Sequence, residues 1–136
     1  MNALYAGLRD RMLKGFVWQD LPLIVGAWHG AYVFDETDVT TQDVIAAGGI
    51  LSAYSLPLTN VIPRTGGYAR SDMALLPTMP VGAEITFLTI MEDTGVLGQE
   101  KQLMYIDEAN GLPFIPNGLD QYVQPDWLDL RGWFRA

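Results

Sequence analysis

Carboxylates are the residues of this chain that come closest to a chemical motif. Four acidic side chains fall within the nine residues from Asp35 to Asp43, and a second acidic pair stands at Asp107 and Glu108. Two carboxylates that face each other can hydrolyse a glycosidic bond, one acting as acid and the other as base or nucleophile. The enzymatic hypothesis that the sequence allows is therefore a hydrolase that uses a pair drawn from Asp35, Glu36, Asp107 and Glu108.

The same residues have a simpler interpretation. Short acidic runs in loops are usually solvated. The spacing from Asp35 to Asp43 also lacks the glycine and the terminal bidentate glutamate of a calcium loop. We therefore interpret this run as a solvated acidic loop, or as a cap for a short helical turn from Thr41 to Ala47, and predict no metal site.

Other catalytic groups are scarce. His29 is the one histidine of the chain, and a lone histidine is far more often a packed or surface residue than a general base. The absence of cysteine excludes disulfides, thiolate nucleophiles and cysteine-ligated metals. The sequence also contains no Gly-x-Ser-x-Gly elbow, phosphate loop or metal-spaced pair. We predict a protein that is not an enzyme, with no catalytic, cofactor-binding or metal-binding residues.

Length and charge limit the remaining functions. A chain of 136 residues is expected to form one domain, and 49% apolar with 18% charged residues is typical of an ordered globular protein. The net charge of −8 would repel a phosphate backbone, so we do not expect nucleic-acid binding. The apolar runs are shorter than the ~20 residues of a membrane span, and residues 1–14 do not resemble a signal peptide. We expect a soluble, unexported protein.

The elements that must position any site are organised around a predicted hairpin. In the run Glu84–Met91 both faces of an alternating strand are largely apolar, which predicts a central strand. The segment Thr94–Lys101 is rich in glycine and charge and suits a hairpin return to a second run, Leu103–Ile106. Asn110-Gly111 and Asn117-Gly118 are turn dipeptides, because both residue types tolerate positive φ angles.

The remaining pattern favours a mainly β fold. Leu4, Leu8 and Met12 recur every four residues and predict an N-terminal helix capped by Asn2. Further strands are predicted over Leu21–Val25, Ala31–Phe34, Ile50–Thr59, Met73–Leu76 and Tyr122–Val123, with breaks at Gly26 and Gly30. We predict an antiparallel β-sandwich or partly closed barrel with one N-terminal helix, divided into a helix over 1–15, a β core over 16–123 and an aromatic C-terminal tail over 124–136.

The tail is the most aromatic part of the chain. Three large rings, two leucines and two arginines lie within its last ten residues, and such rings need a surface to cover. That surface is either the protein's own sheet, with the tail as a final strand, or a neighbouring subunit. We favour a docking arm, because Trp and Arg are enriched at interface hot spots. The predicted interface residues are Trp28, Trp127, Leu130, Arg131, Trp133, Phe134 and Arg135.

Several short motifs resemble, in order, a family of small virion proteins of tailed bacteriophages. They are Asn2-Ala-Leu-Tyr5, Arg9 with Leu13-Lys-Gly15, Glu84-Ile-Thr-Phe87, Glu92-Asp-Thr-Gly95, Tyr105-Ile-Asp107, Gly111-Leu-Pro113 and Pro116-Asn-Gly118. The segment from Tyr105 to Gly118 carries most of the specificity. The sequence departs from the pattern at Leu119 and Asp120, where the family has a second glycine, and aligns poorly between Val17 and Val39.

The resemblance implies a virion structural protein without cofactor or enzymatic activity, assembled in the host cytoplasm. Capsid decoration or a head-to-tail, neck-level role is the first expectation, with the major capsid or the neck and tail proteins as partners and with homo-oligomers. The alternative is a tail-associated, receptor-binding or carbohydrate-binding module, because exposed Trp and Tyr can stack on sugars. The negative charge and the short apolar runs predict no direct contact with nucleic acid or membrane.

Overall fold

The chain folds into a mainly β structure, as the sequence predicts. The computed structural model describes residues 2–14, 21–59, 62–64, 68–108, 112–123 and 134–135. Neither helix in these ranges is long and apolar enough to cross a membrane. The elements are β1 (Asn2–Leu4), α1 (Ala6–Leu13), β2 (Leu23–Gly30), α2 (Thr41–Ala46), β3 (Gly49–Tyr54), β4 (Ile62–Arg64), β5 (Tyr68–Arg70), β6 (Ala74–Leu76), β7 (Phe87–Glu92), β8 (Lys101–Ile106), β9 (Gln121–Val123) and β10 (Phe134–Arg135).

The predicted hairpin is the centre of the main sheet. β7 pairs antiparallel with β8, so that Leu88 lies opposite Ile106 and Glu92 opposite Lys101. The five-stranded sheet has the order β1-β8-β7-β2-β3, which places β7 in the middle. The alternation in β7 explains this position, because a strand with two apolar faces is stable only when both faces are covered. The central-strand prediction is confirmed.

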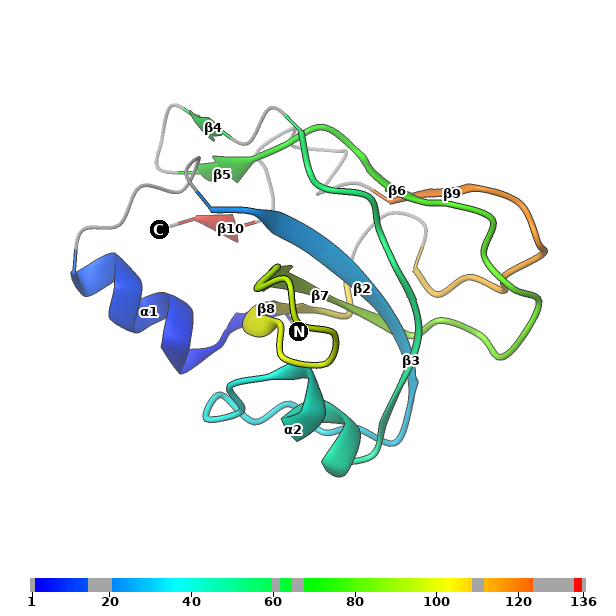
Figure 1. Ribbon diagram of the computed structural model, residues 1–136, viewed down its shortest axis with the longest axis horizontal. Coiled ribbons are helices and arrows are strands. Elements are labelled where there is room, and N and C mark those ends of the chain that lie inside the picture. The colour runs from blue at the N-terminus through cyan, green and yellow to red at the C-terminus, as the bar shows by residue number, and fades with distance from the viewer. Residues whose placement is uncertain are drawn as a thin grey trace.

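The two faces of the sheet are covered by different elements. Figure 1 shows the main sheet between α2 and the two small sheets, β10-β5-β4 and β6-β9. Leu88 and Ile90 of β7 belong to a buried aliphatic cluster that includes Leu76 of β6 and Val123 of β9. Phe87 points the other way, into an aromatic cluster with Val44 of α2. The period of two along β7 therefore separates an aliphatic layer from an aromatic one.

Trp28, predicted as an interface residue, lies in that aromatic layer instead. Its side chain is fully buried, its ring stacks on Phe87 at a centroid distance of 5.8 Å, and its Nε1–H donates to Thr89 Oγ1 at 2.9 Å. Burial with a satisfied N–H is the stable arrangement for an indole in a core. Trp28 therefore has no exposed surface with which to contact a partner.

The N-terminus differs from the prediction. Asn2 does not cap a helix: residues 2–4 form β1 on the edge of the main sheet, paired with β8, and α1 begins only at Ala6. The Asn2 side chain fixes this register, since its Oδ1 accepts from the backbone N–H groups of Asp107 and Glu108, both at 3.1 Å. The pairing with β8 gives backbone groups of residues 2–4 hydrogen-bond partners within the sheet.

The predicted break at Gly26 is also wrong. β2 runs without interruption from Leu23 to Gly30, directly after Pro22, and residues 31–34 are not a strand. Gly26 is required by packing, because a Cβ there would lie 2.5 Å from Met91 Cε and 2.8 Å from Trp28 Nε1. A glycine inside a strand can mark a close approach of neighbours as well as a turn.

The end of the chain pairs with the protein's own sheet. In β10, Phe134 lies opposite Ala69 and Arg135 opposite Tyr68 of β5. This pairing agrees with the tail as a final strand and opposes the docking arm that we favoured. Trp127, Leu130, Arg131 and Trp133 lie outside the described residues. The predicted strand at Tyr122–Val123 exists as part of β9, but it pairs with β6 and not with the main sheet.

Candidate functional site

The acidic run from Asp35 to Asp43 is held by local hydrogen bonds. Asp35 Oδ1 accepts from both the backbone N–H and the hydroxyl of Thr37, at 2.9 and 2.7 Å, and these bonds lower the pKa of Asp35. Glu36 forms an ion pair with Arg9 of α1. Each of these carboxylates thus has a partner of its own, and they do not converge on a shared centre.

The last residue of the run caps a helix, as one of our two interpretations predicted. Asp43 Oδ2 accepts from the backbone N–H groups of Val39 and Thr40, at 2.9 and 3.1 Å, and Thr40 and Asp43 form a capping box at the start of α2. These bonds lower the pKa of Asp43. The carboxylate therefore stabilises the first turn of α2.

The other candidates for catalysis are dispersed. Tyr105 donates its hydroxyl to Asp107 Oδ2 at 3.3 Å, and Glu108 is exposed at the end of β8. His29 is half-buried near the end of β2, and its backbone pairs with Ile50. Among the described residues, no group of three or more His, Asp or Glu side chains is placed to hold a metal ion.

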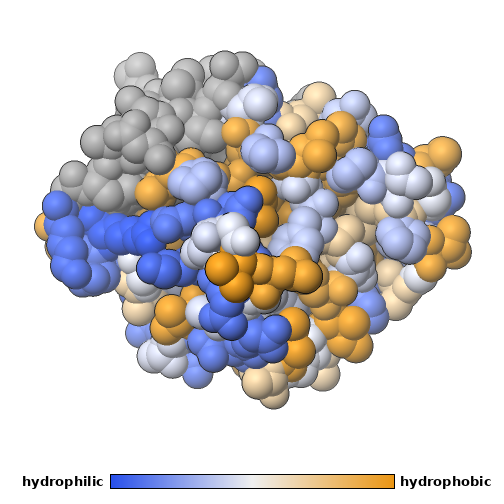
Figure 2. All heavy atoms as spheres, viewed as in Figure 1, coloured by the Kyte–Doolittle hydropathy of each residue, from blue (hydrophilic) through white to orange (hydrophobic). Residues whose placement is uncertain are grey.

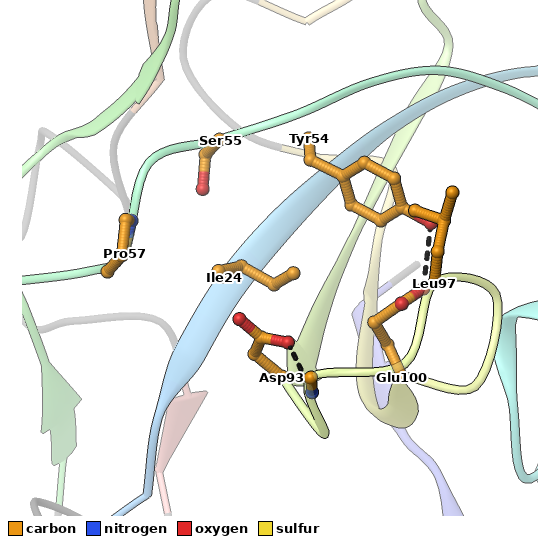
Figure 3. Close-up of a pocket in the computed structure, with 8 residues that line it drawn as sticks. Ile24, Tyr54, Ser55, Pro57, Asp93, Leu97 and Glu100 are labelled. Carbon is orange, nitrogen blue, oxygen red and sulfur yellow. Dashed lines mark hydrogen bonds between the residues drawn. The ribbon is translucent and has the colours of Figure 1, made fainter.

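A pocket that the sequence did not indicate opens where the β7–β8 hairpin approaches β2 and β3 (Figure 3). Its volume is about 350 Å³. Ile24, Pro57 and Leu97 supply apolar walls, and Asp93 and Glu100 bring two carboxylates from the two ends of the hairpin loop. The rest of the lining is Tyr54, Ser55 and Gly95. We call it the hairpin pocket.

Glu100 is the most unusual residue of the hairpin pocket, because it is a carboxylate that is only 3% exposed. Its Oε1 accepts from the hydroxyls of Tyr54 and Thr41, at 2.7 and 2.8 Å, and its Oε2 accepts from the backbone N–H of Gly98 at 3.0 Å. These donors are all neutral, and none of the ion pairs found among the described side chains includes Glu100. A buried charge without a counter-charge is unusual in proteins.

The network around Glu100 joins three parts of the fold. It ties the hairpin loop, through Gly98, to β3 through Tyr54 and to α2 through Thr41. Burial is the main cause that raises the pKa of the Tyr54 hydroxyl, and the hydrogen bond to Glu100 raises it further. The hydroxyl therefore keeps its proton and remains a hydrogen-bond donor at physiological pH. The network therefore fixes the position of one wall of the hairpin pocket.

Gln102 extends this network and carries one unsatisfied atom. The hydroxyl hydrogen of Thr41 is used on Glu100, so Thr41 Oγ1 accepts from Gln102 Nε2 at 3.0 Å. This defines the orientation of the amide. The Oε1 of Gln102 is buried and has no hydrogen-bond partner in the part of the chain that the structure describes. Such an atom lowers stability, since a buried acceptor without a donor loses its hydration.

A second feature is an exposed apolar surface at the end of the molecule that carries β6 and β9. Val81, Ile115, Leu119 and Tyr122 are exposed by 77%, 67%, 66% and 55%. Backbone hydrogen bonds between Met79 and the 118–119 turn hold their segments together, and the β6–β9 pairing places Tyr122 on the same end. Figure 2 shows hydrophobic residues at this end of the molecule, interspersed with hydrophilic ones. We call these four residues the apolar end.

Sequence reasoning found neither feature directly. The hairpin pocket combines residues from three separate parts of the chain, 24, 54–57 and 93–100. Its buried carboxylate, Glu100, lies at the end of a loop whose charged and glycine residues are typical of a solvent-exposed loop. One signal was available: Ile115 and Leu119 flank the predicted Asn117-Gly118 turn, where polar residues are usual. Gly118 has φ +84°, as that turn prediction requires.

Comparison with models of known protein families, with curated proteins and with solved structures finds no match to this chain. Function is therefore inferred from the residues and the geometry of the chain itself.

Proposed function

We propose that this chain is a non-enzymatic structural component of a tailed-bacteriophage virion, acting in capsid decoration or at the head and neck. Its partners would be the major capsid protein or neck and tail proteins, together with copies of itself. The support from sequence is the ordered resemblance of the motifs between Asn2 and Gly118 to that family of small virion proteins.

The observation that carries the proposal from the structure is the apolar end. Four large apolar side chains, each more than half exposed, lie on segments that β6, β9 and the turn at residues 118–119 hold together, and Val81 lies close to Gly118 of that turn. Exposed apolar groups of this kind mark protein–protein contacts when they are grouped and not scattered. The centre of such contacts is poor in charge, which agrees with this composition.

The proposal is tested by substituting the apolar end. Ile115→Asp and Leu119→Asp should leave the isolated domain folded, because both side chains are exposed, but should reduce its incorporation into particles at least tenfold. Val33→Asp is the matched control, because Val33 is 80% exposed and lies on the segment between β2 and α2. Incorporation is measured by quantitative mass spectrometry of gradient-purified particles. If both variants are incorporated like wild type, the apolar end is not the contact surface.

The wild-type copy number in the same measurement distinguishes the positions in the virion. Hundreds of copies per particle correspond to capsid decoration, whereas about six to twelve correspond to a ring at the neck or tail. A wild-type chain that separates completely from particles in the gradient would refute the virion assignment itself.

A further inference from the structure

The hairpin pocket has the size and chemistry to receive one cationic side chain. Ligand pockets for whole small molecules span roughly 300–1,000 Å³, and the cavity of about 350 Å³ stands at the small end of that range. Its walls at Ile24, Pro57 and Leu97 suit an aliphatic stem, and its carboxylates Asp93 and Glu100 suit a positive head. Lysine and arginine combine these two parts.

The electrostatics favour a cation from outside the chain. Glu100 is buried and bonded by neutral donors alone, so a positive group in the pocket would supply the counter-charge that the described side chains lack. Asp93 uses Oδ1 to accept from the Gly95 N–H at 2.9 Å, and Oδ2 has no hydrogen bond from a described residue. Figure 3 shows Asp93 and Glu100 on the hairpin side of the pocket, facing Tyr54 and Ile24.

The chain itself offers few cations for this role. Arg9, Arg11 and Lys14 are already paired with Glu36, Glu92 and Asp10. Lys101 follows Glu100 in β8 but lines a different hollow, beside Arg11 and Lys14, and not the hairpin pocket. A net charge of −8 also makes a basic surface a better occupant of this acidic pocket than a second copy of the chain, whatever contacts copies make elsewhere. The complementary occupant is therefore a different protein that presents a basic residue among apolar ones.

We propose that the hairpin pocket is a docking site for a lysine or arginine side chain of a partner protein, held between Asp93 and Glu100 and covered by the exposed Leu97. The inference deepens the proposed function, and rests on it, insofar as that partner is a neighbouring virion protein. Arginine is the better fit, because its planar guanidinium donates to two carboxylates at once.

The pocket itself is tested on the full-length ¹⁵N-labelled protein with N-acetyl-argininamide as probe. We expect saturable shifts, with a dissociation constant in the millimolar range, at the amides of Gly95, Leu97 and Gly98. The citrulline analogue, which has the same shape without the charge, should produce none. Equal shifts with both probes, or shifts elsewhere on the protein, would overturn the proposal. Calcium chloride serves as a further control, and the proposal also fails if calcium produces the same shifts as the arginine probe.

The matched variants are Asp93→Asn and Asp120→Asn. Asparagine at 93 keeps the acceptor for Gly95 and removes the charge, so probe affinity should fall at least fivefold. Asp120 is likewise an exposed carboxylate that accepts one backbone N–H, from Thr78 at 2.7 Å, but it lies outside the pocket. An equal loss with Asp120→Asn would show that only net charge matters and would refute the site.

Particle incorporation separates this inference from the proposed function. The pocket docks a virion partner if wild type and Asp120→Arg are both incorporated into particles and Asp93→Arg is not. If Asp93→Arg is incorporated like wild type, the virion role stands and the docking role of the pocket fails. If wild type itself is not incorporated, the virion role fails, and the probe titration still decides whether the pocket binds a cationic side chain.

Discussion

Phe87 gives the sharpest test of the core, because its ring is the meeting point of the aromatic layer. It is 3% exposed, and its ring centroid lies 5.8 Å from that of Trp28, 5.5 Å from Tyr32 and 5.2 Å from Tyr105. Replacing it with alanine removes the contacts with these three rings and leaves a cavity in the aromatic layer at the start of β7.

The expected loss is worked from those contacts. A buried Phe→Ala substitution costs about 3–5 kcal/mol, and each aromatic pair adds about 0.5–1.5 kcal/mol beyond the buried area. With three such pairs, Phe87→Ala should fall in the upper half of the range, at about 4–5 kcal/mol. Because domains are stable by only about 5–15 kcal/mol in total, this variant should be close to unfolding at room temperature, with poor recovery of soluble protein.

The assay is urea unfolding followed by tryptophan fluorescence, which is sensitive to this site because Trp28 stacks on Phe87. With a slope of about 2 kcal/mol per molar urea, the midpoint should fall by about 2 M. Phe87→Leu keeps most of the apolar volume without the ring and should lose about 1–2 kcal/mol. Val33→Ala, at a side chain that is 80% exposed, should stay within about 0.5 kcal/mol of wild type. A Phe87→Ala midpoint within about 0.5 M of wild type would refute the central position of β7.

Three further perturbations probe other parts of the fold. Gly26→Ala places a Cβ 2.5 Å from the flexible end of Met91 and 2.8 Å from Nε1 of the buried Trp28 ring. It should cost about 1–3 kcal/mol in unfolding free energy, and a cost below about 0.5 kcal/mol in urea unfolding would contradict the packing explanation. Gln102→Met removes one donor and one unsatisfied buried acceptor, so its urea midpoint should equal or exceed that of wild type; a loss of more than about 1 kcal/mol would show that the amide oxygen has a donor. Burial raises the pKa of Tyr32 and of Tyr105 to about 12 in the folded protein. Both ionise near pH 10 when unfolded, so the folded state binds more protons there and the thermal midpoint should fall as pH rises from about 10 to 12. Tyr105→Phe should flatten that fall, and a flat wild-type profile would contradict these pKa shifts.

At low pH the stability contributed by Asp43 changes in the opposite direction, decreasing as pH falls. The pKa of Asp43 is lowered by the backbone N–H groups that it accepts at the start of α2, so its stabilising effect is present above the unfolded pKa and disappears as pH falls through the folded one. The capping box therefore helps to hold α2 against β3 at neutral pH and not in strong acid.

Of the candidate site, the sequence predicts only those features that residues close together in the chain produce. The acidic run was recognisable as a loop and a helix cap, because Asx turns and caps are made by residues two to four positions apart. The hairpin pocket was not recognisable, because Glu100 obtains its donors from Thr41 and Tyr54, which are 59 and 46 residues away. No local spacing distinguishes a glutamate that will be buried in such a network from one that remains in water.

The sequence by itself determined the elements whose signal is local. The runs Glu84–Met91 and Leu103–Ile106 predicted a hairpin, which the structure contains as β7 and β8. The first run has two apolar faces, and a strand of that kind belongs in the middle of a sheet. Asn117-Gly118 defined a turn with positive φ at the glycine. In each of these cases neighbouring residues supply both the pattern and the physical reason for it.

Tertiary structure decided the rest, because the deciding energy comes from distant partners. Residues 2–4 joined β8 as an edge strand although their spacing suited a helix, Gly26 became a packing site within β2, and Trp28 entered the core although it was predicted at an interface. Intrinsic preferences of well under about 1 kcal/mol per residue are easily exceeded by strand pairing and by the burial of an aromatic ring. The hairpin pocket and the apolar end likewise exist only once segments far apart in the chain have come together.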